Sequence, residues 1–253
     1  MPCEKMGAGC LNVYGRGEQM LAAAIFLERG PYMDLQVKPV RSKDRVKFRC
    51  RMCGACCRHV KNAVMLESLD AFRLAKYLRE RGDSIADIND VFVQYAEPVP
   101  LAEGYPVFTL RVHGAEDACV FLKEGRCGVY EARPRVCRLY PFTVKPGEKG
   151  KDFEYLLCVD KPHHFGDGRV LVNDWFHRNF KREDREFVKR EFQAALDIGR
   201  CLRQLGGSRL DRAMFPLLLY RYDHFDLERP FLPQYDSNQA QLLKILRGLP
   251  DRR

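Results

Sequence analysis

The sequence lacks any apolar run long enough to cross a membrane. A membrane-spanning helix needs about 20 consecutive, predominantly apolar residues, and no stretch of the 253 residues approaches that length. The apolar segment over residues 21–27 is followed at once by Glu28 and Arg29, and it lacks a clean small-residue cleavage site. We therefore expect a cytoplasmic protein without a membrane partner, in a compartment where thiols stay reduced.

Several catalytic signatures are absent as well. The chain has no G-x-x-x-x-G-K-[ST] phosphate loop and no glycine-rich dinucleotide fingerprint. The C-x3-C-x2-C order of radical adenosylmethionine enzymes is missing, because Cys53 and Cys57 are not followed by the required third thiol. No internal repeat or low-complexity tract is visible. These absences direct attention to the residue types that are abundant.

A strong charge imbalance is also missing. Lys and Arg total 43 against 34 for Asp and Glu, which gives a formal net charge of +9. Metal-bound thiolates would lower this excess. The basic residues are spread over the chain and the aromatic residues mostly follow core-like periods, so nucleic acid is not an expected partner. The expected partners are a metal ion or cluster and, as a further possibility, another protein.

Cysteine is plentiful, with eleven residues, an odd number that argues against complete pairing in disulfides. Four cysteines fall within eight positions in the pattern C-x2-C-x2-C-C, namely Cys50, Cys53, Cys56 and Cys57. Four more follow downstream, namely Cys119, Cys127, Cys137 and Cys158. The C-x2-C spacing lets two thiols face one ion when the intervening chain turns, and Gly54 supplies the backbone freedom for that turn. We predict that these eight thiols bind metal.

The segments FRCRMCGACC and CVFLKEGRCGVYEARPRVCRLYPF resemble the YkgJ-like CxxCxxCC family over about residues 46–160. That family is described as zinc- or iron-chelating, and a related module occurs in flagellin lysine-N-methylase. The resemblance implies a role as ligands for Cys50, Cys53, Cys56, Cys57, Cys119, Cys127 and Cys137, with Cys158 as the eighth. It also implies an alternative function, an iron–sulfur-dependent enzyme with redox or protein lysine methyl-transfer chemistry. Whether the chain is an enzyme stays open, and metal storage or delivery is a third hypothesis.

Eight thiols suffice for two four-coordinate centres, although whether the chain holds one centre or two stays open. Cys56 and Cys57 are neighbours whose side chains diverge, so one in each centre is the simplest division. Cys50, Cys53 and Cys56 reproduce the C-x2-C-x2-C run of bacterial ferredoxins, whereas Cys50, Cys53 and Cys57 form an alternative group on one side of a short helix. An iron–sulfur cluster, preferably 4Fe–4S, is favoured over zinc because the spacing is less regular than in zinc ribbons.

Other polar residues near the cysteines have simpler interpretations. His59 is expected on the surface, and the pair His163 and His164 in a loop. One or two of three arginines could donate hydrogen bonds to bound thiolates, namely Arg133, Arg135 and Arg138. Tyr130 and Tyr140 are expected to pack in the apolar shell of the site.

The patterning predicts an α+β protein, with a small cysteine-rich metal-binding core of short β-hairpins flanked by several α-helices. We divide the chain into a poorly packed leader (1–32, with Met33 as a plausible second start), a cysteine-cluster core (33–165) and a helical C-terminal extension (166–253). The expected strands cover 46–49, 62–66 and 107–112, with hairpins over 119–130 and 142–158. The expected helices cover 68–81, 84–95, 131–140, 173–205, 209–224 and 237–249, and loops cover 97–104 and 226–234.

Overall fold

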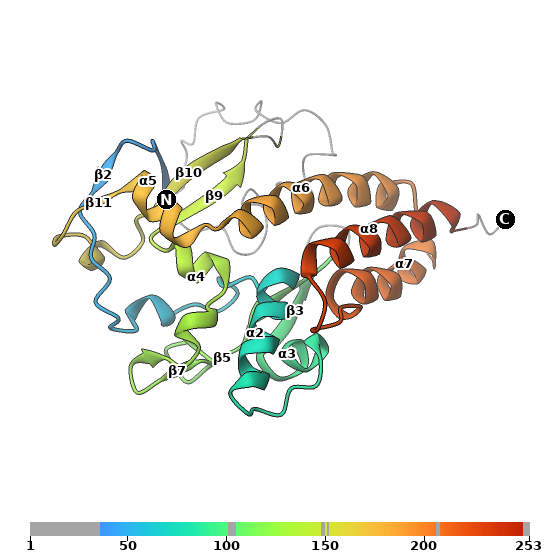
Figure 1. Ribbon diagram of the computed structural model, residues 1–253, viewed down its shortest axis with the longest axis horizontal. Coiled ribbons are helices and arrows are strands. Elements are labelled where there is room, and N and C mark those ends of the chain that lie inside the picture. Colours follow the sequence, from blue (N-terminus) through green and yellow to red (C-terminus); the bar gives the residue numbers. More distant parts are fainter. Residues whose placement is uncertain (1–35, 101–104, 148–149, 151, 206–207, 250–253) are drawn as a thin grey trace, which may run out of the picture.

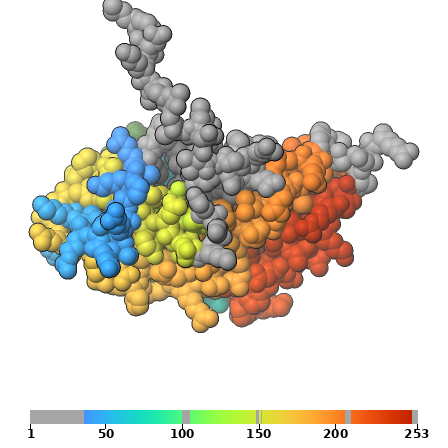
Figure 2. Space-filling view, turned by 90° about the horizontal axis from the view of Figure 1, so that it is seen from above, coloured from blue at the N-terminus to red at the C-terminus, as the bar shows by residue number. Residues whose placement is uncertain are grey.

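A computed structural model describes residues 36–100, 105–147, 150, 152–205 and 208–249. The chain is a mixed α+β protein, as its patterning predicts. In Figure 1, the C-terminal helices between residues 182 and 248 lie together at one end, and the strands between residues 142 and 171 lie at the other. Figure 2 shows from above that the first described residues, in blue, and the last ones, in red, lie at opposite ends. The predicted leader lies outside the described residues. Among the described helices, none is both long and apolar enough to cross a membrane.

The largest sheet has three antiparallel strands in the order β1–β10–β9. Their bounds are Val37–Val40, Phe153–Cys158 and Phe142–Pro146, respectively. The hairpin predicted over residues 142–158 is confirmed, with Phe142 opposite Leu157. On its other side, the central strand β10 pairs with β1, and Val37 lies opposite Cys158. The sheet therefore carries the last predicted ligand at the end of β10.

A smaller sheet pairs β2 (Arg45–Val46) with β11 (Val170–Leu171). The strand predicted over residues 46–49 is therefore wrong beyond Val46. The Phe48 side chain is instead 3% exposed, and its ring makes edge contacts with Tyr140 and Trp175. This aromatic contact positions the backbone immediately before Cys50.

Two helices and a strand pair follow the first cysteine motif. Their bounds are α2 (Ser68–Glu80), α3 (Ile88–Tyr95), β3 (Ala96–Pro100) and β4 (Pro106–Leu110). The helix predicted over 68–81 and the first part of the strand over 107–112 are confirmed. The strand predicted over 62–66 is reduced to a single bridge between Met65 and Thr109.

Two predicted boundaries in this region are wrong. The second helix begins at Ile88 rather than after Ser84, because the Asp87 carboxylate accepts a hydrogen bond from the backbone N–H of Asp90 and caps the helix there. Residues 97–100 were expected in a loop but pair with β4. The two prolines of β3 are tolerated because this sheet has only two strands.

The C-terminal segment is helical, as expected, but its boundaries differ. The helices are α5 (Val172–Asn179), α6 (Arg182–Arg203), α7 (Ser208–Leu218) and α8 (Phe231–Gly248), with a π-helical turn η5 (Leu219–Asp223) after α7. The single helix predicted over 173–205 is wrong, because the chain breaks at Phe180. The loop predicted over 226–234 is wrong from Phe231 onward, where α8 begins.

Buried apolar side chains form two clusters. The first cluster is built on α2 and α3 and includes Phe187, Phe231 and Tyr235. The second lies between the β9–β10 hairpin and helices α5 to α8, and it includes Ile198. Helix α6 contributes to both, and both draw on residues before and after position 165. The division of the chain at that position stays a prediction.

Candidate metal centre

The first cysteine motif forms a knuckle, residues 50–57, that ends in a 3-10 turn, η1 (Ala55–Cys57). Gly54 enters this turn at a φ of 70°, a left-handed conformation that favours glycine. A Cβ atom at this position would meet the carbonyl oxygen of Gly125 at 2.5 Å. Glycine is therefore required at position 54 both by the turn and by the close approach of the chain at Gly125.

The chain leaving the knuckle is held by a neighbouring turn. The backbone N–H of His59 donates to the carbonyl of Glu116 at 2.7 Å, and that of Val60 donates to Asp117 at 3.1 Å. Both acceptors lie between β5 (Val112–His113) and β6 (Ala118–Cys119). These bonds place the knuckle beside the strand that carries Cys119.

The hairpin predicted over residues 119–130 is confirmed only for β7 (Leu122–Lys123) and β8 (Arg126–Cys127). Its tight turn holds both Glu124 and Gly125 at positive φ, as in the turns that match the twist of paired strands. Cys119 is not on an arm of this hairpin, which corrects the prediction, because β6 pairs with β5 instead.

A further backbone bond still brings the two cysteine-bearing segments together. The N–H of Gly128 donates to the carbonyl of Phe121 at 2.8 Å, one step beyond the last pair of the hairpin. Cys119 is buried and Cys127 is half-buried. The two thiols therefore enter the site from adjoining ribbons.

Cys137 lies on α4 (Arg135–Leu139), which is only five residues long. The helix predicted over 131–140 is divided into a 3-10 turn, η3 (Tyr130–Ala132), and α4. The division arises because Pro134 precedes α4 in an extended conformation. In addition, the residue before a proline, here Arg133, is disfavoured in the helical conformation. So short a helix depends on contacts with the rest of the protein.

Two arginines of α4 supply those contacts. The buried Arg135 donates from Nε and Nη2 to the carboxylate of Glu67, at 2.8 and 2.7 Å. Arg138 donates to both carboxylate oxygens of Asp184, at 2.8 and 3.1 Å. Glu67 immediately precedes α2 and Asp184 lies in the first turn of α6. The two ion pairs therefore hold Cys137 between these helices.

The acidic side chains around α4 have shifted pKa values. Burial and the charge of Glu67 raise the pKa of Asp70 to about 7, although Arg138 and Arg135 act in the opposite direction. Burial alone would raise the pKa of Asp184, but hydrogen bonds from Arg138 and the nearby charge of Arg73 outweigh it and hold this pKa below its usual range. Asp184 is thus a carboxylate at neutral pH, and its charge is available to Arg138.

The last predicted ligand is tied to the knuckle by a lysine. Cys158 ends β10, and its Sγ donates to Asp160 Oδ2 at 3.2 Å. Lys161 Nζ donates to the carbonyl oxygens of Ala55 and Arg58, at 2.8 and 2.7 Å. Because these carbonyls lie at the two ends of η1, Lys161 fixes the segment after Cys158 against the turn that carries Cys56 and Cys57.

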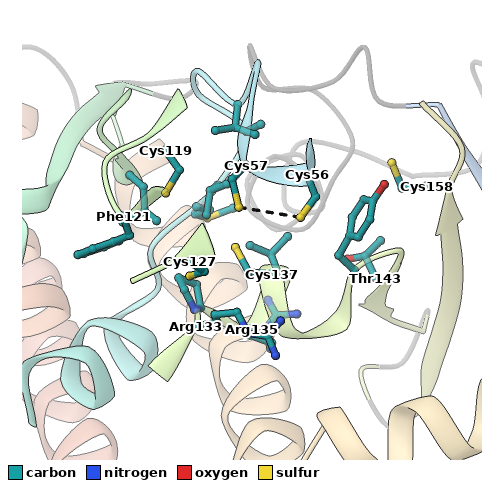
Figure 3. A pocket seen from close by; sticks show the side chains of 18 of the residues that line it. Cys56, Cys57, Cys119, Phe121, Cys127, Arg133, Arg135, Cys137, Thr143 and Cys158 are labelled. Atoms are coloured by element: carbon teal, nitrogen blue, oxygen red, sulfur yellow. Dashed lines mark hydrogen bonds between the residues drawn. The ribbon is translucent and has the colours of Figure 1, made fainter. Parts of the chain in front are cut away.

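Seven of the eight predicted ligands line one cavity of about 240 Å³, and Figure 3 shows most of them. They are Cys50, Cys56, Cys57, Cys119, Cys127, Cys137 and Cys158. The eighth, Cys53, is exposed on the knuckle and is not part of the wall. In the part of the chain that the structure describes, no three Cys, His, Asp or Glu side chains converge on a position for one ion. The thiols surround a volume rather than a point.

The thiols of the wall differ in pKa. Burial, and then negative charge at Cys119, raises the pKa of Cys137 well above its usual value. Burial also raises the pKa of Cys119 to about 11. The Cys56 thiol differs, because its hydrogen bond with Cys57 outweighs burial and, helped by the charge of Lys161, lowers the pKa to about 6. Since thiolate is the form that binds metal, the buried thiols would have to release protons in order to bind a metal.

The other residues that the sequence singled out differ in whether they line the cavity. Tyr130, Tyr140 and Arg133 line the cavity, and the Arg133 guanidinium lies 3.6 Å from the centre of the Tyr130 ring. Arg135 and Arg138 are engaged by carboxylates, as described above. The three histidines are absent from the cavity wall: His59 and His163 are exposed, and His164 Nδ1 forms a hydrogen bond with the Tyr140 hydroxyl.

Sequence reasoning missed Lys161 and the pair Glu67 and Asp70. Lys161 comes three residues after Cys158, so a cation beside the last ligand was a visible signal. Asp70 is 2% exposed and lies within the apolar helix predicted from Ser68. An acidic residue at such a position indicates a buried partner, because an unpaired buried carboxylate is costly.

Comparisons with known proteins agree with this site. Residues 49–160 match the model of the CxxCxxCC family, described as a "putative zinc- or iron-chelating domain". An uncharacterized protein of Methanocaldococcus jannaschii is 28% identical over 130 residues, which make up 49% of this chain and 63% of that protein. The chain thus spans less than two thirds of the length of this relative. No solved structure matches the chain. The seven cysteines of the cavity wall all fall within residues 49–160, the part of the chain that matches the CxxCxxCC family model.

Proposed function

We propose that the chain is a metalloprotein that binds an iron–sulfur cluster, of the 4Fe–4S type, through its cysteine cluster. The observation that carries the proposal is the cavity of about 240 Å³ whose wall holds seven thiols. All nine cysteines of the described part of the chain are free thiols, which supports a reducing compartment such as the cytoplasm. The donor set consists of thiols, the ligands that both iron–sulfur clusters and zinc accept.

The size of the cavity favours a cluster over zinc. Zinc is held by thiolate sulfurs at about 2.3 Å, so four thiolates closing on one zinc ion leave almost no space between them. A cavity needs about 10–15 Å³ to hold one water molecule, and the cavity whose wall includes these thiols measures about 240 Å³. A cluster adds iron and inorganic sulfide of its own and would fill more of this space.

The remaining wall residues suit a thiolate-bound group. Buried apolar side chains such as Val60, Val64 and Phe121 line the same cavity, and such a lining limits the access of water. Lys161 and Arg133 bring positive charge, which offsets part of the negative charge of several thiolates. When bound, an iron–sulfur cluster would supply electron transfer or Lewis-acid chemistry, and the burial and hydrogen bonding around it would tune its potential.

The test is anaerobic purification followed by analysis of iron, zinc and acid-labile sulfide, together with a visible spectrum. We expect a brown protein with iron and sulfide in similar amounts. Cys137→Ser should lose metal, because Cys137 lines the cavity, whereas Cys201→Ser should keep the wild-type content, because Cys201 packs in the second apolar cluster. A colourless protein with stoichiometric zinc would replace the cluster by a zinc site, and a metal-free protein would reject metal binding altogether.

A further inference from the structure

The eight cysteines separate into two groups by burial and packing. One group belongs to the first apolar cluster or packs against it, and its members are half-buried or buried: Cys57, Cys119, Cys127 and Cys137. The other group is exposed or half-buried and belongs to neither apolar cluster of the described residues: Cys50, Cys53, Cys56 and Cys158. We infer that the chain holds two metal centres, an inner one on the first group and an outer one on the second. This inference rests on the proposed function.

The inner group is brought together by separate elements that converge on one end of the cavity. In Figure 3, Cys57, Cys119, Cys127 and Cys137 lie around this end, with Phe121 beside them. Each member is held by backbone or ionic contacts described above, from the η1 turn, β6, β8 and α4. A metal bound here would connect the η1 turn to three elements that follow one another between residues 118 and 139, and it would be shielded from solvent.

Lys161 connects the segments that carry two members of the outer group, Cys56 and Cys158. Its two hydrogen bonds to the η1 turn draw the end of β10, with Cys158, toward the knuckle. In Figure 3, Cys56 lies on the side of Cys57 that faces Cys158. The remaining members, Cys50 and Cys53, precede Cys56 at the C-x2-C-x2-C spacing that holds three corners of a ferredoxin cluster, with a distant cysteine as the fourth.

The two centres meet at Cys56 and Cys57. These neighbours have their Sγ atoms 3.9 Å apart, yet one belongs to the exposed group and the other packs against the apolar cluster. The arrangement gives the two centres different roles. The inner metal stabilises the fold, and the outer metal is accessible to solvent, chelators and redox partners.

The experiment compares metal content, melting temperature and loss of metal to a chelator, with EDTA for zinc or a ferrous chelator for iron. In the wild-type protein we expect two phases of metal loss, the outer centre being removed first. Cys158→Ser should keep about half the metal, lack the fast phase and melt close to the wild-type temperature. Cys119→Ser should lose the slow phase and melt at a much lower temperature. Cys201→Ser is the matched control and should resemble wild type in metal content and in both phases of metal loss, because Cys201 lies outside both groups.

The outcomes distinguish the failure of the two-centre inference from the failure of metal binding itself. Complete loss of metal in both Cys158→Ser and Cys119→Ser would show a single centre and overturn this inference, while metal binding itself would stand. Full metal content in Cys158→Ser would overturn it as well. A metal-free wild-type protein would reject the proposed function. Should Cys119→Ser fail to fold, the wild-type chelation decides, because a single phase of metal loss contradicts two centres of different exposure.

Discussion

Gly54 determines the shape of the knuckle at the scale of a single residue. Its φ of 70° alone would cost a non-glycine residue on the order of 1 kcal/mol. The short approach of a Cβ atom to Leu122 Cδ1 at 2.9 Å and to the Gly125 carbonyl at 2.5 Å adds a steric cost. We predict that Gly54→Ala lowers both the melting temperature and the metal content, because the clash moves the knuckle away from β7–β8.

Gly125→Ala provides the control for this prediction. Gly125 has a similar φ of 75°, but a Cβ atom there would meet no other atom within 4 Å. Gly125→Ala should therefore lose only the stability that a positive φ costs a non-glycine residue, and its metal content should equal that of the wild type. Equal losses of stability and metal in the two variants would contradict the steric explanation.

At the scale of elements, the structure shows which predictions local sequence could support. Helix α2 and the β9–β10 hairpin were predicted because their patterns are local. The break between α5 and α6 was not, because it depends on Arg138, which donates to the carbonyl of Asn179 at 3.1 Å and to Asp184. Asp184 in turn accepts from the backbone N–H of Lys181 at 2.9 Å and starts α6 there.

The candidate site shows the same limit. The cysteine spacing indicated thiol ligands, and those on the knuckle could be grouped from sequence alone. The attachment of Cys158 to the knuckle could not, because it depends on Lys161 binding carbonyls 106 and 103 residues away. The position of α4 likewise depends on Glu67, which lies 68 residues before Arg135. Tertiary hydrogen bonds of this kind leave no periodic pattern in the sequence.

We predict that Glu67→Gln displaces α4 and weakens metal binding at Cys137. Both Glu67 and Arg135 are about nine-tenths buried, and removing one partner of a buried ion pair typically costs about 3–5 kcal/mol because the other charge is left uncompensated. The Glu67 charge also raises the pKa of Asp70, so that pKa should fall in the variant. Denaturant unfolding and metal analysis measure the first effect, and carboxyl NMR titration measures the second.

Glu183→Gln is the matched control for the loss of the Glu67–Arg135 ion pair. Glu183 pairs with Arg73 at 2.7 Å, but its side chain is 43% exposed. An exposed pair of this kind is typically worth less than about 1 kcal/mol. A loss of stability in Glu67→Gln no larger than that in Glu183→Gln would show that the Glu67–Arg135 pair does not anchor α4.

At the scale of the whole molecule, the candidate metal site and the C-terminal helices are stabilised by different means. The cavity wall is assembled from the knuckle, short ribbons, a five-residue helix and one strand end, none of which is stable alone. Helices α6 and α8 instead share a buried network, in which Arg221 donates to the Tyr235 hydroxyl at 2.8 Å and Tyr235 donates to Glu191 at 2.6 Å. Metal should therefore matter far more to the first region than to the second.

We predict that removing the metal opens the cavity wall and leaves the C-terminal helices folded. Metal that binds only the folded state stabilises it by about 4 kcal/mol when free metal is about a thousand times Kd, and this contribution should fall on the elements that carry ligands. Hydrogen exchange measured by mass spectrometry should show faster exchange in β7, β8 and α4 of the chelated protein. Protection in α6 and α8 should be unchanged, and added metal should restore the wall. Uniform loss of protection over the chain would show instead that the metal supports one cooperative fold, and unchanged exchange would show that it supports none.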